Sequence, residues 1–129
     1  MKMSETAVRA FFEQLNTGDM ENIRPLVKRA TWRPMVKGMT SAESYSGDAI
    51  VDDFLVPVRG IFRHGDPKVS IDLLVADDNA VAVETAGLGK LADGRDYDNR
   101  YAWFFQLKDG QITEIHEYFD SHYVAGLAD

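Results

Sequence analysis

Three acidic residues in the second half of the sequence lie in or beside apolar stretches, where a carboxylate can do proton chemistry. Glu84 stands between Val83 and Thr85, and Glu117 and Asp120 come at the end of the last apolar stretch. An apolar pocket disfavours a charged carboxylate and raises its pKa toward the value that a general acid or base needs. Glu117 and Asp120 are therefore candidate proton-transfer residues, with a solvated strand end as the alternative. Glu84 is a candidate ligand contact, with an outward position on a sheet as the alternative.

A long aromatic segment begins at Tyr97, and its residues alternate in character as they do in a strand. One face carries Tyr97, Asn99, Tyr101, Trp103, Phe105 and Leu107. This more apolar face is expected to line the concave side of a sheet, with hydrogen-bonding groups at Asn99 and Tyr101. Tyr101 is a candidate catalytic residue and Asn99 a candidate ligand-binding residue, because both can donate to an oxygen that develops negative charge. The alternative for Tyr101 is a core position with its hydroxyl group satisfied locally.

The direction in which Glu117 points depends on an irregularity in the last strand. Ile112 and Ile115 can both face inward only if a β-bulge separates them. With a bulge, Glu117 points inward; without one, His116 takes that place. Asp120, at the end of the strand, could turn into the mouth of a cavity.

Four large apolar side chains complete the candidate ligand-binding set. Trp32 and Trp103 lie in expected strands, and Phe54 and Val58 lie on the apolar face of an expected helix. A packing role in the core is the alternative for both tryptophans.

Apolar periodicity predicts three helices before a series of strands. The helices are expected from Ser4, as the N-cap, to Gly18; from Asp19 onward, with a kink at Pro25; and from about Asp48 to Phe62. The expected strands are Thr31–Val36, Lys68–Val75, Ala80–Leu91, Arg95–Lys108 and Gln111–Asp120. Short turns such as Asp109-Gly110 join the last four strands, so antiparallel neighbours are expected. The sequence thus predicts one α+β domain over residues 1–129, in which helices and a curved sheet enclose a pocket.

Composition narrows the classes of partner. The 129 residues carry 14 basic and 21 acidic side chains, a net charge of −7 that disfavours nucleic acid. There is no cysteine, and His64, His116 and His122 lack the spacing of metal ligands, so neither a metal nor a cofactor is expected. No apolar stretch reaches the roughly 20 residues of a membrane span. A cytoplasmic location and no membrane partner are the expectation.

Several segments together resemble a known family. They are Leu15-Asn16-Thr17-Gly18-Asp19, the run from Asn99 to Phe105, the run from Lys108 to Ile112, and Glu117-Tyr118-Phe119-Asp120. With the order of elements, they resemble the SnoaL-like branch of the NTF2-like superfamily over nearly the whole chain. The resemblance implies the cone-shaped fold also called a cystatin-like roll, in which a curved antiparallel sheet and three helices enclose a pocket.

The resemblance also bears on individual residues. Similarity to phenazine-pathway members implies an inward Glu117, and similarity to SnoaL-like cyclases implies an acid or base role for Asp120. Hand alignment with ketosteroid isomerases places Phe11, Arg33 and Ala102 at the positions of that family's tyrosine, base and protonated aspartate. The mechanism of those isomerases is therefore not expected here.

The expected function is binding of a small apolar or partly polar organic ligand, with acid–base isomerisation or cyclisation of a carbonyl or hydroxylated compound. A non-catalytic ligand-binding or dimerisation module is the alternative, because fold does not decide function. A homodimer through the convex sheet face is expected in either case, since that face carries Phe104 and other apolar residues.

Overall fold

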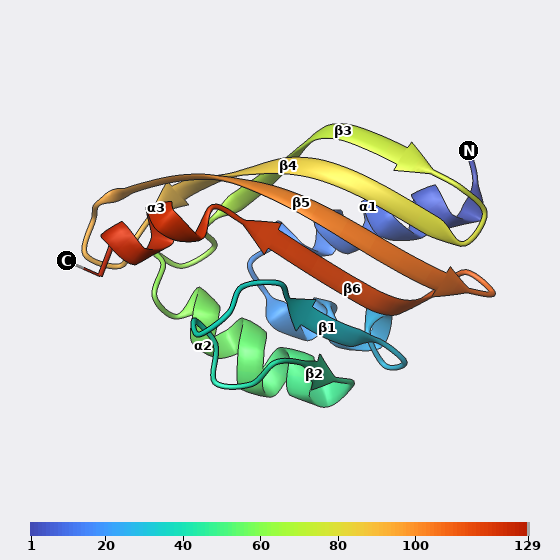
Figure 1. Ribbon diagram of the computed structural model, residues 1–129, viewed down its shortest axis with the longest axis horizontal. Coiled ribbons are helices and arrows are strands. Elements are labelled where there is room, and N and C mark those ends of the chain that lie inside the picture. The colour runs from blue at the N-terminus through green and yellow to red at the C-terminus, as the bar shows by residue number, and fades with distance from the viewer. Residues whose placement is uncertain (129) are drawn as a thin grey trace.

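The computed structural model describes residues 1–128 and shows a long curved sheet with helices on its concave side and at one end (Figure 1). The helical elements are α1 (Met3–Leu15), the 3₁₀ turns η1 (Met20–Asn22) and η2 (Arg24–Leu26), the π-helix η3 (Ile50–Leu55), α2 (Val56–Arg59) and α3 (Ser121–Gly126). The strands are β1 (Thr31–Pro34), β2 (Tyr45–Ser46), β3 (Lys68–Ala76), β4 (Ala80–Lys90), β5 (Asp96–Lys108) and β6 (Gln111–Phe119). The α+β prediction and the four long strands are confirmed, with ends that differ by one residue.

The six strands form one sheet in the order β2-β1-β6-β5-β4-β3. Strands β3 to β6 are an antiparallel meander, whereas β1 pairs parallel to β6, with Trp32 opposite Ile115. The β5–β6 turn uses Asp109 and Gly110 with φ of 51° and 76°, as the tight hairpin turns of twisted strands require. The long strands place many side chains side by side on one concave face.

The N-terminal helices differ from the sequence prediction in their caps and regularity. Ser4 lies inside α1, where its hydroxyl group donates to the carbonyl of Asp77, and Lys2 is the N-cap, so the predicted cap is wrong. The second expected helix is reduced to η1 and η2, because Pro25 has no N–H to continue it. The third begins as a π-helix and ends at Arg59 instead of Phe62.

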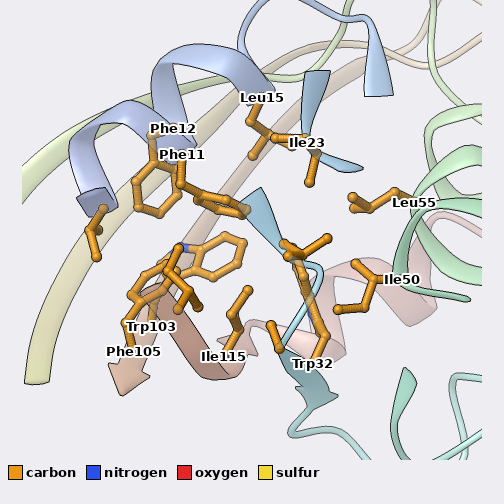
Figure 2. Packing of buried hydrophobic residues seen from close by; sticks show 14 of the residues in the cluster. Phe11, Phe12, Leu15, Ile23, Trp32, Ile50, Leu55, Trp103, Phe105 and Ile115 are labelled. Carbon is orange, nitrogen blue, oxygen red and sulfur yellow. The ribbon is translucent and has the colours of Figure 1, made fainter. Parts of the chain in front are cut away.

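A layer of aromatic rings joins α1 to the concave face of the sheet (Figure 2). Phe11 and Phe12 point from α1 toward β5, with ring centroids 5.4 Å between Phe11 and Phe105 and 5.2 Å between Phe12 and Trp103. Trp32 adds a further ring from β1, 5.5 Å from Trp103. Edge-to-face packing of this kind is favourable and rigid, so it forms a firm wall behind the sites described below.

Helix α3 was not predicted from the sequence. It begins after Asp120 and lies beside one end of the sheet, where the hydroxyl group of Tyr123 accepts a hydrogen bond from the backbone N–H of Asp98. Tyr123 of this helix and Leu127, which follows it, pack against a second, smaller apolar cluster made by Phe62, Leu91 and Tyr97. Across residues 1–128 no helix has the length and apolar character to cross a membrane.

Candidate functional site

A cavity of about 610 Å³ lies where the two apolar clusters meet. Its wall is mostly apolar and comes from the concave face of the sheet, η3 and α2, and the C-terminal segment. This volume lies within the usual range for pockets that bind small molecules. The polar or charged side chains in the lining are Thr40, Arg59, Asp93, Arg95, Tyr97, Tyr101 and Glu117.

A β-bulge turns Glu117 into this cavity. The pairing of β5 with β6 shifts between Gln106 and Leu107, and Thr113 is the extra residue on β6. The isoleucines before and after the bulge are both buried, and Glu117 lies on the same face with 8% of its surface exposed. Of the two directions open to the last strand, the structure therefore has the one with an inward carboxyl group.

Burial raises the pKa of Glu117 to about 7, because the charged carboxylate loses its hydration. Two groups oppose this effect. The indole Nε1–H of Trp32 donates to Glu117 Oε1 over 3.2 Å, and the positive charge of Arg59 also favours the carboxylate. A carboxyl group with a pKa near neutrality can both accept and release a proton under physiological conditions.

Tyr101 belongs to a short chain of hydrogen bonds. The hydroxyl groups of Tyr97 and Tyr101 are 2.6 Å apart, and the amide nitrogen of Asn99 donates to the Tyr97 hydroxyl over 3.0 Å. Either hydroxyl group can donate to the other, and in the arrangement in which Tyr97 donates, the hydroxyl hydrogen of Tyr101 is left for a ligand. Burial raises the pKa of both phenols, so they stay neutral donors.

A glycine makes room for the Tyr101 ring. Gly87 lies on β4, and a Cβ atom there would come within 2.9 Å of Tyr101 Cε1. A side chain at this position would therefore displace the Tyr101 ring. The ring of Tyr101 in turn stacks on Trp103 at a centroid distance of 5.8 Å.

The structure brings six of the nine predicted site residues to the cavity. They are Glu117, Tyr101, Trp32, Trp103, Phe54 and Val58. Both tryptophans are also core residues, so the two alternatives offered for them coincide. The Trp103 indole N–H donates to Thr85 Oγ1 over 2.9 Å.

The other three predicted residues do not line the cavity, which corrects the sequence prediction. Asn99 is buried outside the lining, and its amide nitrogen donates to the hydroxyl group of Tyr97, which does line the cavity. Glu84 is exposed on the outer face of β4, because alternation directs it away from its buried neighbours. Asp120 is exposed, and its Oδ1 accepts from the backbone N–H of Tyr123 over 3.0 Å, so its carboxylate caps α3.

The positions compared with the ketosteroid isomerase residues also lie outside the lining. Phe11 is fully buried in the aromatic layer. Arg33 pairs with Glu114 over 3.0 Å at the surface, and Ala102 lies opposite Glu84 on the outer face.

Sequence reasoning missed Arg59, the last residue of α2. It is half-buried and lines the cavity, and its Nη1 donates to the backbone carbonyl of Asp66 over 3.3 Å. Burial lowers the pKa of this guanidinium. The sequence does contain a signal for Arg59, because Leu55, Arg59 and Phe62 follow helical spacing along an apolar face.

The curved sheet, the helices on its concave side and the cavity between them define an NTF2-like fold. Residues 8–115 match the family described as the SnoaL-like domain, and the chain belongs to this family. No curated protein matches the sequence.

Solved structures with the same fold cover almost the whole chain. An NTF2-like protein from Burkholderia pseudomallei has a TM-score of 0.85 at 15% identity, with 98% of both chains covered. TerC, co-crystallised with polyporic acid, has a TM-score of 0.83 at 18% identity, again over 98% of both chains. An LEH-like epoxide hydrolase from M. tuberculosis has a TM-score of 0.72 at 20% identity, over 98% of this chain and 92% of that one. At such identities the likeness shows the fold alone.

Proposed function

We propose that the chain binds a small organic molecule in the cavity and transfers protons on it, as an isomerase or cyclase of apolar carbonyl or hydroxylated compounds. The observation that carries this proposal is Glu117, a buried carboxyl group in the cavity wall with a pKa raised to about 7. A purely structural core would place an apolar side chain there, since a buried carboxyl group costs stability.

The chemistry would combine Glu117 with Tyr101. In its ionised form Glu117 removes a proton from a carbon next to a carbonyl group, while the Tyr101 hydroxyl donates to the carbonyl oxygen as it gains negative charge. Glu117, now protonated, returns the proton to another atom of the same ligand. No covalent intermediate is needed.

The apolar lining supports the same ligand class. Trp32, Trp103 and Phe54 offer ring faces and edges, and only a few polar groups interrupt them. Among the structural relatives, TerC was crystallised with polyporic acid and another is an epoxide hydrolase. Both fit a cavity that takes small organic molecules.

Solvent deuterium exchange tests the proposal with simple ketones in place of the natural substrate. A panel of apolar ketones is incubated in D₂O with the protein, and deuterium uptake next to the carbonyl group is followed by NMR. We expect uptake for at least one ketone and a fall of about 100-fold or more in Glu117→Gln, as for loss of a general base.

Glu114→Gln is the matched control, because Glu114 lies on the same strand but at the surface, paired with Arg33. It is expected to retain wild-type exchange. Equal exchange in wild type and Glu117→Gln would refute the acid–base role. Ketones that bind in the cavity without any exchange would favour the non-catalytic ligand-binding alternative.

We also propose a homodimer through the outer face of the sheet. Apolar side chains gather there in register, with Val75, Ala82 and Phe104 on adjacent strands and Phe104 51% exposed. Exposed apolar clusters of this kind are commonly covered by a partner surface. The particle mass in solution tests this proposal.

A cytoplasmic location of the protein stays a prediction.

A further inference from the structure

The cavity wall contains a guanidinium group, that of Arg59, which has no carboxylate at salt-bridge distance although the charge of Glu117 acts on it through space. Arg59 makes one hydrogen bond, from Nη1 to the backbone carbonyl of Asp66, and forms no salt bridge within residues 1–128. The carboxylate of Asp66 is already engaged, because its Oδ2 accepts from Arg63 over 2.9 Å and from the backbone N–H of Lys90 over 3.0 Å. The remaining N–H groups of Arg59 are therefore available to another acceptor.

The other charged groups of the lining have interaction partners within the protein. Asp93 and Arg95 pair with each other over 2.9 Å, and both are about half exposed. Glu117 accepts from Trp32, and its carboxylate attracts Arg59 through space without reaching salt-bridge distance. Arg59 is thus the cationic group in the described lining that has no carboxylate partner at salt-bridge distance.

Arg59 shares the cavity with a neutral hydrogen-bonding group. Tyr101 lines the same cavity, and when Tyr97 donates to Tyr101, the hydroxyl hydrogen of Tyr101 is free to point at a ligand. A guanidinium group offers several N–H groups in one plane, which suits carboxylate, sulfonate and planar enolate oxygens. Most of the remaining wall is apolar and suits a ring system.

We propose that Arg59 binds an acidic oxygen group of the ligand, so that the cavity selects apolar compounds with one anionic oxygen group over neutral compounds of the same shape. This selectivity rests on the proposed ligand-binding function and adds the charge of the ligand to it. The net charge of −7 makes general attraction of anions to the protein unfavourable, so a preference for an anion has to come from a local cation.

A pair of fluorescent probes separates charge from shape. N-phenylnaphthylamine is neutral, and anilinonaphthalenesulfonate is the same arylamine with one sulfonate group. Both are titrated into the wild-type protein, and displacement of one by the other shows that they share a site. We expect the sulfonate to bind at least about tenfold more tightly than the neutral probe, as for a charge-assisted hydrogen bond.

Three variants locate the effect. Arg59→Met should lose the preference for the sulfonate while keeping the affinity for the neutral probe, and Arg59→Lys should retain part of the preference. Arg100→Met removes a cation from the outer sheet face, where Arg100 is exposed and pairs with Asp98, and should leave both affinities unchanged.

The outcomes separate the selectivity from the proposed function. Equal wild-type affinity for the two probes overturns the role of Arg59 but leaves a ligand cavity in place, and this comparison stands even if Arg59→Met does not fold. A sulfonate preference that survives in Arg59→Met, or disappears in Arg100→Met, also overturns it. Binding of neither probe overturns the ligand cavity and the selectivity together.

Discussion

Neighbouring groups act on the pKa of Glu117 in opposite directions, so single substitutions can change this pKa. Desolvation raises its pKa, while the Trp32 indole and the Arg59 charge lower it. A hydrogen bond from Trp32 stabilises the carboxylate more than the neutral acid, because the indole N–H can only donate.

Trp32→Phe should therefore raise the pKa of Glu117 above its present value of about 7. The ring and most of the packing remain, but the donor to Oε1 is lost, and we expect a rise of about one pH unit. Carbon-13 NMR of the labelled Glu117 carboxyl group measures the titration directly. Trp103→Phe is the control, since the Trp103 donor goes to Thr85. An unchanged midpoint in Trp32→Phe would contradict a stabilising role for this hydrogen bond.

The same carboxyl group should make stability depend on pH. The pKa of Glu117 rises from 4.5 to about 7 on folding, so between these values the folded state holds more protons than the unfolded chain. The contribution of Glu117 to stability is therefore fully present below pH 4.5 and is lost as the pH rises through 7, by about 3 kcal/mol at most for this buried group.

Glu117→Gln should remove that part of the pH dependence. Urea unfolding of both proteins at several pH values measures it, and the variant should become the more stable of the two as the pH rises through this window. Parallel stability curves for the two proteins would show that Glu117 ionises normally in the folded state.

Helix α3 is a short element that is capped by one side chain. It has only six residues, and Asp120 accepts from the N–H of Tyr123 at its start. Short helices depend on caps and packing because their own hydrogen bonds are few.

Asp120→Ala should loosen α3 by about 1 kcal/mol, the usual value of an N-cap. Hydrogen exchange of the Tyr123 and Val124 amides should accelerate by roughly fivefold. Asp120→Asn retains an oxygen that can cap the helix and should behave like wild type, in exchange and in any activity. A loss of activity in Asp120→Asn with an intact α3 would restore Asp120 as a proton-transfer residue.

The outer sheet face determines the expected assembly of the whole molecule. The ring of Phe104 packs edge-on against Tyr118 at 5.8 Å, within an apolar surface that also contains Leu73 and Val75. A charge placed in the centre of such a surface has to be desolvated when two copies associate. The cost of this desolvation weakens the association strongly.

Phe104→Lys should convert the proposed dimer into a monomer, with the dissociation constant raised by about tenfold or more. Sedimentation equilibrium measures the mass. Gln106→Lys adds the same charge to the same strand and face, two residues away beside Ala80 and Glu114, and should weaken the dimer less than Phe104→Lys. A wild-type particle with the mass of one chain would reject the dimer.

Much of the architecture could be predicted from the sequence because it depends on local chemistry. Alternation between polar and apolar residues marked β5 and its concave face, where Tyr101 and Trp103 were expected and are found. The Asp109-Gly110 turn followed from the backbone that a hairpin requires. Both signals arise within a few residues, so they do not depend on distant contacts.

The composition of the site was decided by tertiary structure. One extra residue, Thr113, determines whether Glu117 points inward, and its bulge depends on pairing with β5. Asn99 and Asp120 have suitable chemistry, yet one supports Tyr97 and the other caps α3. Arg59 is a site residue only because the tertiary fold brings the end of α2 and the sheet to the same cavity. Sequence periodicity assigns a side chain to a face, but which groups come within reach of one another is determined by packing between segments far apart in the chain.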